Sequence, residues 1–440
     1  MNLRPLFHVV GERSSVYMLW KRRPPSTLMS HNNRSFSSSS SSSSGQIQKV
    51  MVVGSGVIGL RTALELLERN IQVVLRSPFP PLDPRTTSMG AGGLWMPFHA
   101  ESDRLTQWSH DTLTELLLPE HKDRVERLPV VQLFKDHNGP QVEEFIVPST
   151  TGTSTNSPSP TTIAKLPDWT ADTRLEFQHL TVEMLMWQNK VHQLRIPREE
   201  LLKEAGYLHA WMFQTAIVDT PQYLQYMLDT ILQHDASADV NVETDHMYTS
   251  IDEVCHVAAS EHGCDAVINC AGLGSRELCA DDDIVGARGV TLQFDRSPCR
   301  YDTNRVDQEK DAVLLVDEPP WGSDTMPAYL IPRGDVLVVG GSYLVGDTEP
   351  SVRASEREQL LRNARQFGID VDAVQPVGEW TGFRPSRTTI RCELEEPSTS
   401  GGVKVVHSYG HGGSGWTIFT GVARHSVDLL LGIDGRRPSV

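Results

Sequence analysis

The stretch that decides the fold is VMVVGSGVIGL, residues 50–60 of a 440-residue chain. Residues 47–53 (IQKVMVV) predict a buried strand, which leads directly into Gly54, Gly56 and Gly59, and these glycines match the spacing G-x-G-x-x-G. Glycines so placed allow a tight turn, close approach of a pyrophosphate and close helix–strand packing. A helical pattern over 57–69 and the short apolar run 71–75 follow. This order predicts a βαβ unit that binds a dinucleotide.

The chain departs from the dinucleotide fingerprint just after the second apolar run, 71–75. An acidic residue is expected about 20 residues beyond the glycines, where it binds a ribose. Arg76 and Ser77 stand there instead. Ser77 is able to hydrogen-bond a ribose hydroxyl, whereas Arg76 would suit a 2′-phosphate and leaves an NADP-dependent dehydrogenase open as an alternative.

Composition excludes several classes of function. The formal net charge of -16 and pI near 5.4 argue against a nucleic-acid partner or a polybasic membrane contact. No apolar run approaches the roughly 18 residues needed to span a bilayer. The 6 cysteines show neither a CxxC pair nor zinc spacing. We therefore expect no metal site and a reducing compartment.

Residues 1–45 differ from the rest. They contain six arginines and lysines, a single acid (Glu12) and the serine run 37–44. This composition is typical of a transit peptide, so we expect a mitochondrion or plastid. A disordered tail with a serine linker is the alternative, and it leaves peroxisome or cytoplasm open. The final RRPSV is not an SKL-type peroxisomal signal.

Two further segments place small residues between bulky ones: RTTSMGAGGLWMPF (85–98) and HSYGHGGSGWT (407–417). Small residues there would let the backbone approach a flat ring system. With these motifs the chain resembles the D-amino-acid oxidase family, which includes D-aspartate oxidase and binds FAD. The resemblance covers most of 47–431 and also rests on PDWTADTRLEFQHLT (167–181), TPQYLQYML (220–228), INCAGLG (268–274), AYLIPRGDVLVVGG (328–341) and TGFRPSR (381–387).

The resemblance implies an α/β fold with two interleaved domains. A Rossmann-like FAD-binding domain is expected from 46–100, 206–290 and 375–432, and an α+β substrate domain with a mainly antiparallel sheet from 101–205 and 291–374. The expected FAD-binding residues are Gly54, Ser55, Gly56, Val57, Ile58, Gly59, Arg76, Ser77, Thr86, Thr87, Gly92, Gly93, Leu94, Tyr248, Gly412, Gly413, Ser414, Gly415, Trp416 and Thr417.

The resemblance also implies the catalytic residues. Arg384 matches the family arginine that binds the substrate α-carboxylate, and a guanidinium grips a carboxylate through two parallel hydrogen bonds. A structural salt bridge is the alternative role. Tyr329 matches the tyrosine that donates to the same carboxylate, and Gly413 matches the glycine whose carbonyl accepts from the substrate amine. His411 is expected to be structural, because hydride passes from the substrate α-carbon to flavin N5 without a base.

The implied reaction is oxidative deamination of a D-amino acid by O2, giving a 2-oxo acid, ammonia and H2O2. The resemblance also leaves a homodimer open.

Thr325 stands at the position where animal members of the family carry a tyrosine on a mobile lid.

The substrate class is predicted from missing charges. The resemblance implies that D-aspartate oxidases carry two extra arginines for the second carboxylate of their substrate. One would follow the glycine pair 340–341, where this chain has Ser342 and Tyr343, and the other would lie on the strand before Tyr329, which is here the apolar run 312–316. Neither arginine is present. We therefore expect neutral D-amino acids. D-aspartate oxidase, a glycine- or sarcosine-type oxidase, and a flavoprotein scaffold without turnover remain alternatives. Arg300 and Arg305 lie in a loop that the sequence does not place.

Overall fold

The predicted βαβ unit is confirmed in the computed structural model. Strand β1 (Lys49–Val53) enters the glycine turn, helix α1 (Val57–Glu68) follows, and β2 (Gln72–Ser77) returns parallel to β1. The structure describes residues 47–97, 100–135, 144–146, 162–164, 166–234, 238–242, 247–296, 310–323, 325–395 and 403–433. Residues 1–45, the loop 147–160, Arg300 and Arg305 therefore lie outside the described residues.

Parallel strands form the first half of a large mixed sheet. The order is β16 (Lys404–His411), β9 (Ala266–Asn269), β1, β2 and β8 (Ala238–Val242), and each neighbouring pair is parallel. The carboxyl ends of these strands consequently meet at one edge, which is where ligands bind in open α/β sheets.

Mostly antiparallel strands form the second half of the same sheet. β3 (Val125–Phe134) and β11 (Val313–Val316) are the one parallel neighbouring pair among its described strands. The order is β6 (Gln178–Thr181), β7 (His209–Val218), β3, β11, β12 (Ala328–Arg333), β13 (Val336–Gly340), β10 (Val285–Asp295) and β15 (Gly378–Leu394). Strand β14 (Leu344–Val345) pairs with β10, and β4 (Glu144–Ile146) pairs with β5 (Thr162–Ala164) in a separate ribbon.

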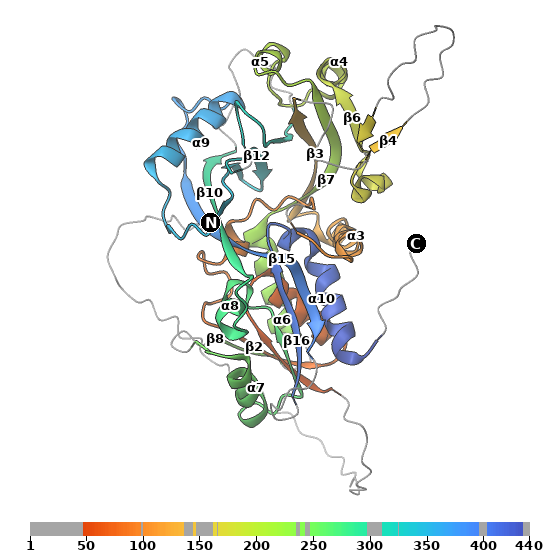
Figure 1. The fold of residues 1–440 in the computed structure, drawn as a ribbon, viewed down its shortest axis with the longest axis vertical. Coiled ribbons are helices and arrows are strands. Elements are labelled where there is room, and N and C mark those ends of the chain that lie inside the picture. The colour runs from red at the N-terminus through yellow and green to blue at the C-terminus, as the bar shows by residue number, and fades with distance from the viewer. Residues whose placement is uncertain are drawn as a thin grey trace, which may run out of the picture. The chain divides into compact units, whose positions relative to one another are not determined.

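Strand β15 joins the two halves. Its residues up to Ser386 pair with β10, and those from Ser386 onward pair with β16. The register shifts between Ser386 and Arg391, and such an irregularity bends a strand and re-aims its side chains. Figure 1 shows β15 running from the antiparallel part into the part that contains α10 and β16. Arg384 lies immediately before this junction, opposite Ala287.

Helices cover both faces of the parallel half. Val50 and Val52 of β1 face a cluster formed with α1, α3 (Leu105–Leu116), α6 (Thr220–Gln233) and α10 (Gly415–Leu431), whereas Met51 and Val53 face α7 (Ile251–Ser260). Coverage on both faces explains why β1 reads as an unbroken apolar run.

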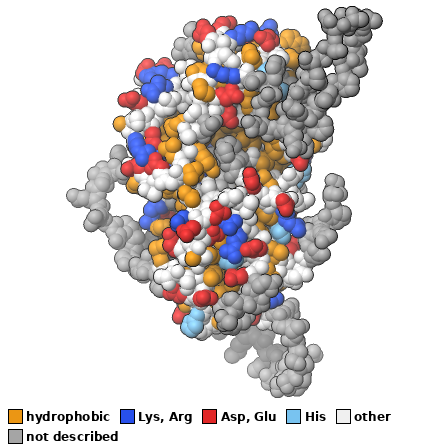
Figure 2. Space-filling model, in the orientation of Figure 1, with side chains coloured by type: hydrophobic (Ala, Val, Ile, Leu, Met, Phe, Trp, Pro, Cys, Tyr) orange, Lys and Arg blue, Asp and Glu red, His pale blue; other side chains and the backbone are white. Residues whose placement is uncertain are grey.

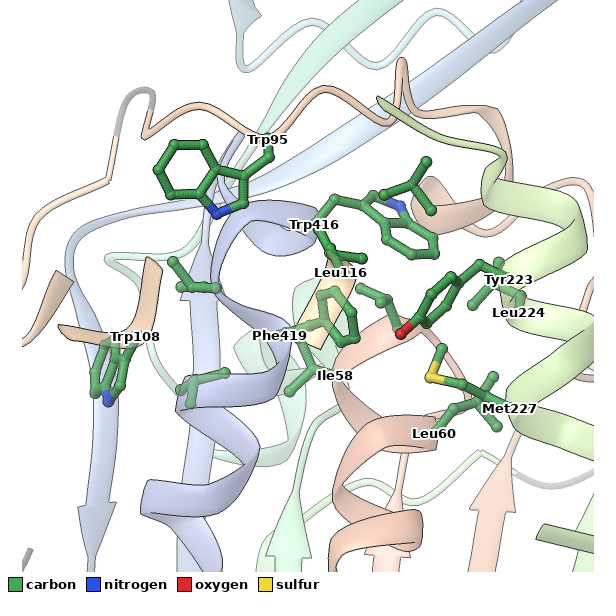
Figure 3. Close-up of a cluster of buried hydrophobic side chains, with 14 of the residues drawn as sticks. Ile58, Leu60, Trp95, Trp108, Leu116, Tyr223, Leu224, Met227, Trp416 and Phe419 are labelled. Carbon is green, nitrogen blue, oxygen red and sulfur yellow. The ribbon is translucent and has the colours of Figure 1, made fainter. Parts of the chain in front are cut away.

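Figure 3 shows aromatic and aliphatic side chains converging in the first of these clusters. Tyr223 of α6 packs edge-on against Trp416 and Phe419 of α10, with ring centroids 5.9 and 5.5 Å apart. The helix that carries the second glycine turn is thereby fixed against α1 and α6.

The antiparallel half has one face covered by helices and one turned inward. α4 (Val182–His192), α5 (Glu199–Glu204) and α9 (Ala354–Gln366) pack with residues such as Leu314 and Leu330. The alternate residues Leu315 and Ile331 point to the other face and join the central cluster. Short helices α2 (Thr87–Gly90) and α8 (Ser275–Leu278), and the 3₁₀ turns Pro119–His121, Asp168–Ala171, Thr173–Leu175 and Gly272–Gly274, complete the described elements.

The predicted fold class is confirmed, while the two-domain division stays a prediction. The sheet runs without a break through both predicted domains, and β7 and α3 each pack with elements of the domain to which they were not assigned. β7 falls in 206–290 yet pairs with β3 and β6, and α3 falls in 101–205 yet packs on α10. Their apolar faces match partners that are distant in the sequence.

Among the described helices, none combines the length and the apolar character that a membrane span requires.

Candidate active site

A cavity of about 1030 Å³ lies at the carboxyl ends of the parallel strands. One side is lined by residues that follow β1, β2, β9 and β16, among them Gly54, Ser77 and Cys270. The other side is lined by the inward face of the antiparallel half, including Leu315 and Tyr329. This is the position predicted for a ligand, and the volume suits a large organic cofactor together with a small substrate.

Two fingerprint glycines are required by backbone contacts. Gly54 has φ +105°, and a Cβ atom there would lie 2.3 Å from the carbonyl oxygen of Cys270. A Cβ atom on Gly59 would lie 1.9 Å from the carbonyl oxygen of Gly54. Gly59 thus allows α1 to pack against β1, as the spacing predicts, and it does not itself line the cavity.

The amino end of α1 lies at the cavity. Gly56 is the N-cap residue and has no side chain to satisfy the first-turn N–H groups, which lack acceptors within the helix. The N–H of Val57 donates to Ser88 Oγ at 3.0 Å. Gly56, Val57 and Ile58 all line the cavity, so the remaining N–H groups and the positive end of the helix dipole suit a phosphate.

The residues at the end of β2 also reach the cavity. Ser55 Oγ donates to Ser77 Oγ at 2.9 Å. Arg76 is 1% exposed, and its Nη2 lies 3.2 Å from Nε2 of His262 while Nη1 donates to the carbonyl of Leu75. The guanidinium is therefore engaged with protein groups. This arrangement gives no support to a dedicated 2′-phosphate site.

The two small-residue segments lie beside each other. Thr417 Oγ1 donates to the carbonyl of Met96 at 2.8 Å, and Thr87 Oγ1 donates to the carbonyl of Phe383 at 2.7 Å. Most of the expected FAD-binding residues of these segments line the cavity: Thr86, Thr87, Gly92, Gly93, Leu94, Gly412, Gly413, Gly415 and Trp416, with Tyr248 from elsewhere. Ser414 and Thr417 are buried and lie outside the lining.

His411 is an uncharged group at the cavity wall. It is 3% exposed, and its Nε2 has no hydrogen-bond partner among the described residues. Burial lowers the pKa of His411 from 6.5 to about 3, so the imidazole is neutral at physiological pH. A buried, unpaired ring nitrogen at the cavity fits a bound polar cofactor, because such an atom ordinarily finds a partner.

Arg384 presents a positive charge to the cavity. Its Nη1 donates to the carbonyl of Ser342 at 2.9 Å, and its guanidinium carbon lies 5.4 Å from the ring centroid of Tyr343. It also packs on Gly289, where a Cβ atom would lie 2.5 Å from Nη1. No carboxylate of the described residues forms an ion pair with Arg384. The alternative of a structural salt bridge therefore finds no partner in the described part of the chain.

Tyr329 lies next to Arg384 on the inward face. Its ring packs flat on the glycine pair that ends β13, because a Cβ atom on Gly340 would lie 2.0 Å from Cζ of Tyr329. Burial raises the pKa of Tyr329, although the charges of Arg384 and Arg333 oppose this change. The phenol therefore stays protonated near neutral pH and is able to donate a hydrogen bond.

Other lining residues were not predicted from the sequence. Tyr343 Oη lies 2.9 Å from Ser386 Oγ, and Trp380 Nε1 donates to the carbonyl of Pro84 at 3.0 Å. Gln132 on β3 and Leu315 on β11 reach the cavity from strands that carry no motif. The signal available was the alternation of side chains along these strands, which gives the inward face only once the pairing is known.

The described residues hold no cluster of acidic, histidine or cysteine side chains suited to a metal ion. The glycine turn, the amino end of α1, the unpaired His411 nitrogen and the cavity size fit a dinucleotide that carries a ring system. Fold and cavity thus define a dinucleotide-dependent enzyme of the oxidoreductase type.

Comparison with known proteins gives the family. The model of the family DAO, FAD dependent oxidoreductase, matches residues 49–429, and the chain belongs to this family. Its cofactor is FAD. The NADP alternative based on Arg76 is therefore set aside.

Individual relatives share only a modest fraction of their residues with this chain. A D-amino-acid oxidase of Rubrobacter xylanophilus is 26% identical over 390 residues, covering 87% of this chain and 96% of that protein. A D-aspartate oxidase of Homo sapiens is 24% identical over 397 residues, covering 87% and 94%. A solved structure of glycine oxidase from Bacillus cereus has a TM-score of 0.58 at 14% identity and covers 89% and 96% of the two chains, a likeness of fold.

Proposed function

We propose that this protein catalyses the oxidative deamination of neutral D-amino acids to 2-oxo acids, ammonia and H2O2. The observation that carries the proposal is Arg384, a half-buried cation at the cavity that has no acidic partner among the described residues. A cation of this kind favours an anionic ligand. The name of the Rubrobacter relative supports the amino-acid class and the D configuration.

The substrate is held by groups on two strands and one turn. Arg384 on β15 binds the α-carboxylate with two parallel hydrogen bonds, and Tyr329 on β12 donates a further one. The carbonyl of Gly413 accepts from the amine. Three anchors on separate elements fix the orientation of the α-carbon, and orientation accounts for a large part of the rate in reactions of this kind.

Bound FAD would supply the redox chemistry, as acceptor of the hydride from the α-carbon and donor of two electrons to O2. The chain contributes binding and positioning. His411 is neutral at the wall of the cavity, and it serves to pack and hydrogen-bond there. No basic group is required, because the α-hydrogen leaves with its electron pair.

Neutral side chains suit the lining beside the carboxylate anchors. On β3, β11 and β12 and at the residue after β11, the described lining consists of Gln132, Leu315, Val316, Asp317, Ala328, Tyr329 and Ile331. No arginine or lysine is among them. A second carboxylate would be buried beside Asp317 without a cation, which is strongly unfavourable. Arg300 and Arg305 lie outside the described residues.

The proposal is tested by anaerobic titration of the purified holoenzyme with D-alanine and L-alanine while the flavin absorbance is followed. We expect D-alanine alone to bleach the flavin, and air to restore it with formation of H2O2. Bleaching by D-aspartate, glycine or sarcosine, and not by D-alanine, would show that the proposed substrate class is wrong and that the bleaching compound belongs to the true one. Intact absorbance with all of them would refute turnover and favour a binding scaffold.

We also propose that residues 1–45 direct the protein to a mitochondrion or plastid. Their arginine- and serine-rich, acid-poor composition supports this. Fusion of residues 1–45 to a fluorescent protein is the test, with a matched fusion in which the arginines are replaced by glutamine. A purely cytosolic signal from the first fusion would refute the proposal.

A further inference from the structure

One polar side chain at the cavity, that of Gln132, belongs neither to the residues proposed to bind the carboxylate nor to the glycine turns. Gln132 on β3 is 6% exposed and lines the cavity. No other residue in the described ranges hydrogen-bonds to its amide. None of its amide atoms belongs to the buried atoms that lack a partner, so the amide faces the open cavity and not the closed protein interior. Its donor and acceptor are thus available to a ligand.

Strand pairing fixes where this amide stands relative to the anchors. Gln132 lies opposite Leu315 of β11, and Leu315 lies opposite Tyr329 of β12. Directly paired residues project to the same face of a sheet, so the three side chains form one row on the inward face. Neighbouring strands are about 4.8 Å apart, which places the backbones of Gln132 and Tyr329 roughly 10 Å from each other.

The chemical character of the side chains changes along this row. It begins with the tyrosine that would hold the carboxylate, continues with an aliphatic side chain and ends with a neutral amide. Ile331, two residues along β12 from Tyr329, adds a second aliphatic group to the same face. A substrate fixed at its carboxylate would lay its first side-chain carbons on Leu315 and direct its far end toward Gln132.

We infer that Gln132 is a specificity residue that recognises D-amino acids with a neutral, hydrogen-bonding side chain, and that D-glutamine represents this class. This inference rests on the proposed function. A carboxamide offers one donor group and one acceptor, which match the acceptor and donor of Gln132. A site with a buried polar group discriminates against an apolar analogue because that analogue leaves the group unpaired.

The test compares D-glutamine with D-methionine, which has a similar length and no amide. The ratio of their kcat/KM values is measured for the wild-type holoenzyme and for Gln132→Met. We expect the ratio to fall about tenfold in the variant, because the neutral hydrogen bonds between the two amides are lost for D-glutamine alone. D-methionine should keep its kcat/KM or gain slightly.

Gln214→Met provides a matched control. Gln214 lies on the adjacent strand β7, three residues beyond Trp211, which pairs with Gln132. An odd spacing places it on the opposite face, and it does not line the cavity. This variant should leave the ratio unchanged. If Gln132→Met fails to fold with its flavin, Gln132→Ala removes the amide without adding volume and should lower the ratio in the same way.

The outcomes separate the two proposals. Turnover of both substrates with a ratio that Gln132→Met leaves within about twofold, or an equal fall for both, would overturn the role of Gln132 while leaving the oxidase reaction intact. If the wild type oxidises neither, the proposed function fails. The same three proteins are then compared in calorimetric binding of the two amino acids, where an unchanged affinity ratio overturns the inference and a tenfold fall supports it.

Discussion

Replacement of Arg384 by leucine should separate substrate binding from cofactor binding. Hydrogen bonds to charged groups contribute about 1.5–3 kcal/mol each, and a guanidinium makes two to a carboxylate. Because Arg384 is half-buried and partly hydrated, we take the lower part of the resulting range, about 3–4 kcal/mol. At about 1.4 kcal/mol per factor of ten, kcat/KM for a D-amino acid should fall roughly 10²- to 10³-fold.

The assay is steady-state oxidase activity on holoenzyme of matched flavin content. Arg387→Leu is the control, since it lies three residues further on the same strand, is paired with Asp281 at 3.0 Å and does not line the cavity. Its kcat/KM should stay within about threefold of wild type, because the ion pair that it removes is partly buried and lies away from the cavity lining. Arg384→Lys should lie between the two, since it keeps the charge and loses the planar fork. A loss below tenfold in Arg384→Leu would refute the carboxylate assignment.

The remaining predictions concern Tyr329, Gly59 and His411. Tyr329→Phe should raise the KM roughly 3- to 10-fold at constant flavin content, because one hydrogen bond is lost and the ring still packs on Gly340; an unchanged KM in steady-state assays would contradict the role of its hydroxyl. Gly59→Ala should lower the free energy of unfolding by roughly 1–3 kcal/mol or more and reduce flavin content, because its methyl group meets the carbonyl of Gly54; thermal denaturation and absorbance ratios test this, and wild-type values would contradict it. Because burial lowers the pKa of His411 to about 3 from 6.5, the unfolded chain binds a proton that the folded chain does not, so the free energy of unfolding decreases as pH falls from 6.5 toward 3, by at most about 1.4 kcal/mol per pH unit. Urea denaturation near pH 6.5 and near pH 5 should accordingly show a smaller decrease for His411→Asn than for wild type; equal decreases would show that His411 is not buried neutral.

The glycine-turn region was predictable from sequence because its determinants are local. The turn at Gly54, the packing at Gly59 and the bounds of α1 follow from residues within about twenty positions of one another, and the structure confirms them. The hairpin β12–β13 has equally local determinants, because one tight turn joins its two adjacent strands. Turn chemistry and side-chain period act over short stretches, so they are legible in the sequence.

The inner wall of the cavity was not predictable in this way. Gln132 lies on a strand without a motif, and Tyr343 lies between β13 and β14, just after the motif 328–341. Nothing in either local stretch indicates that they meet Arg384 and Tyr329 around one cavity. Acidic and basic side chains are interspersed over the face seen in Figure 2, so surface charge gives no guide to the site either.

The sequence by itself determined the βαβ unit and the glycine turns, because hydrophobic period and backbone requirements are properties of contiguous residues. The fold class followed from the resemblance of its motifs to a known family. The tertiary structure alone decided which distant strands pair and in what register. It set Gln132, Leu315 and Tyr329 in one row, and it placed Arg384 where β15 passes from β10 to β16. A shift of one residue in any of these pairings would turn the side chain to the opposite face, so the site depends on contacts that no single segment encodes.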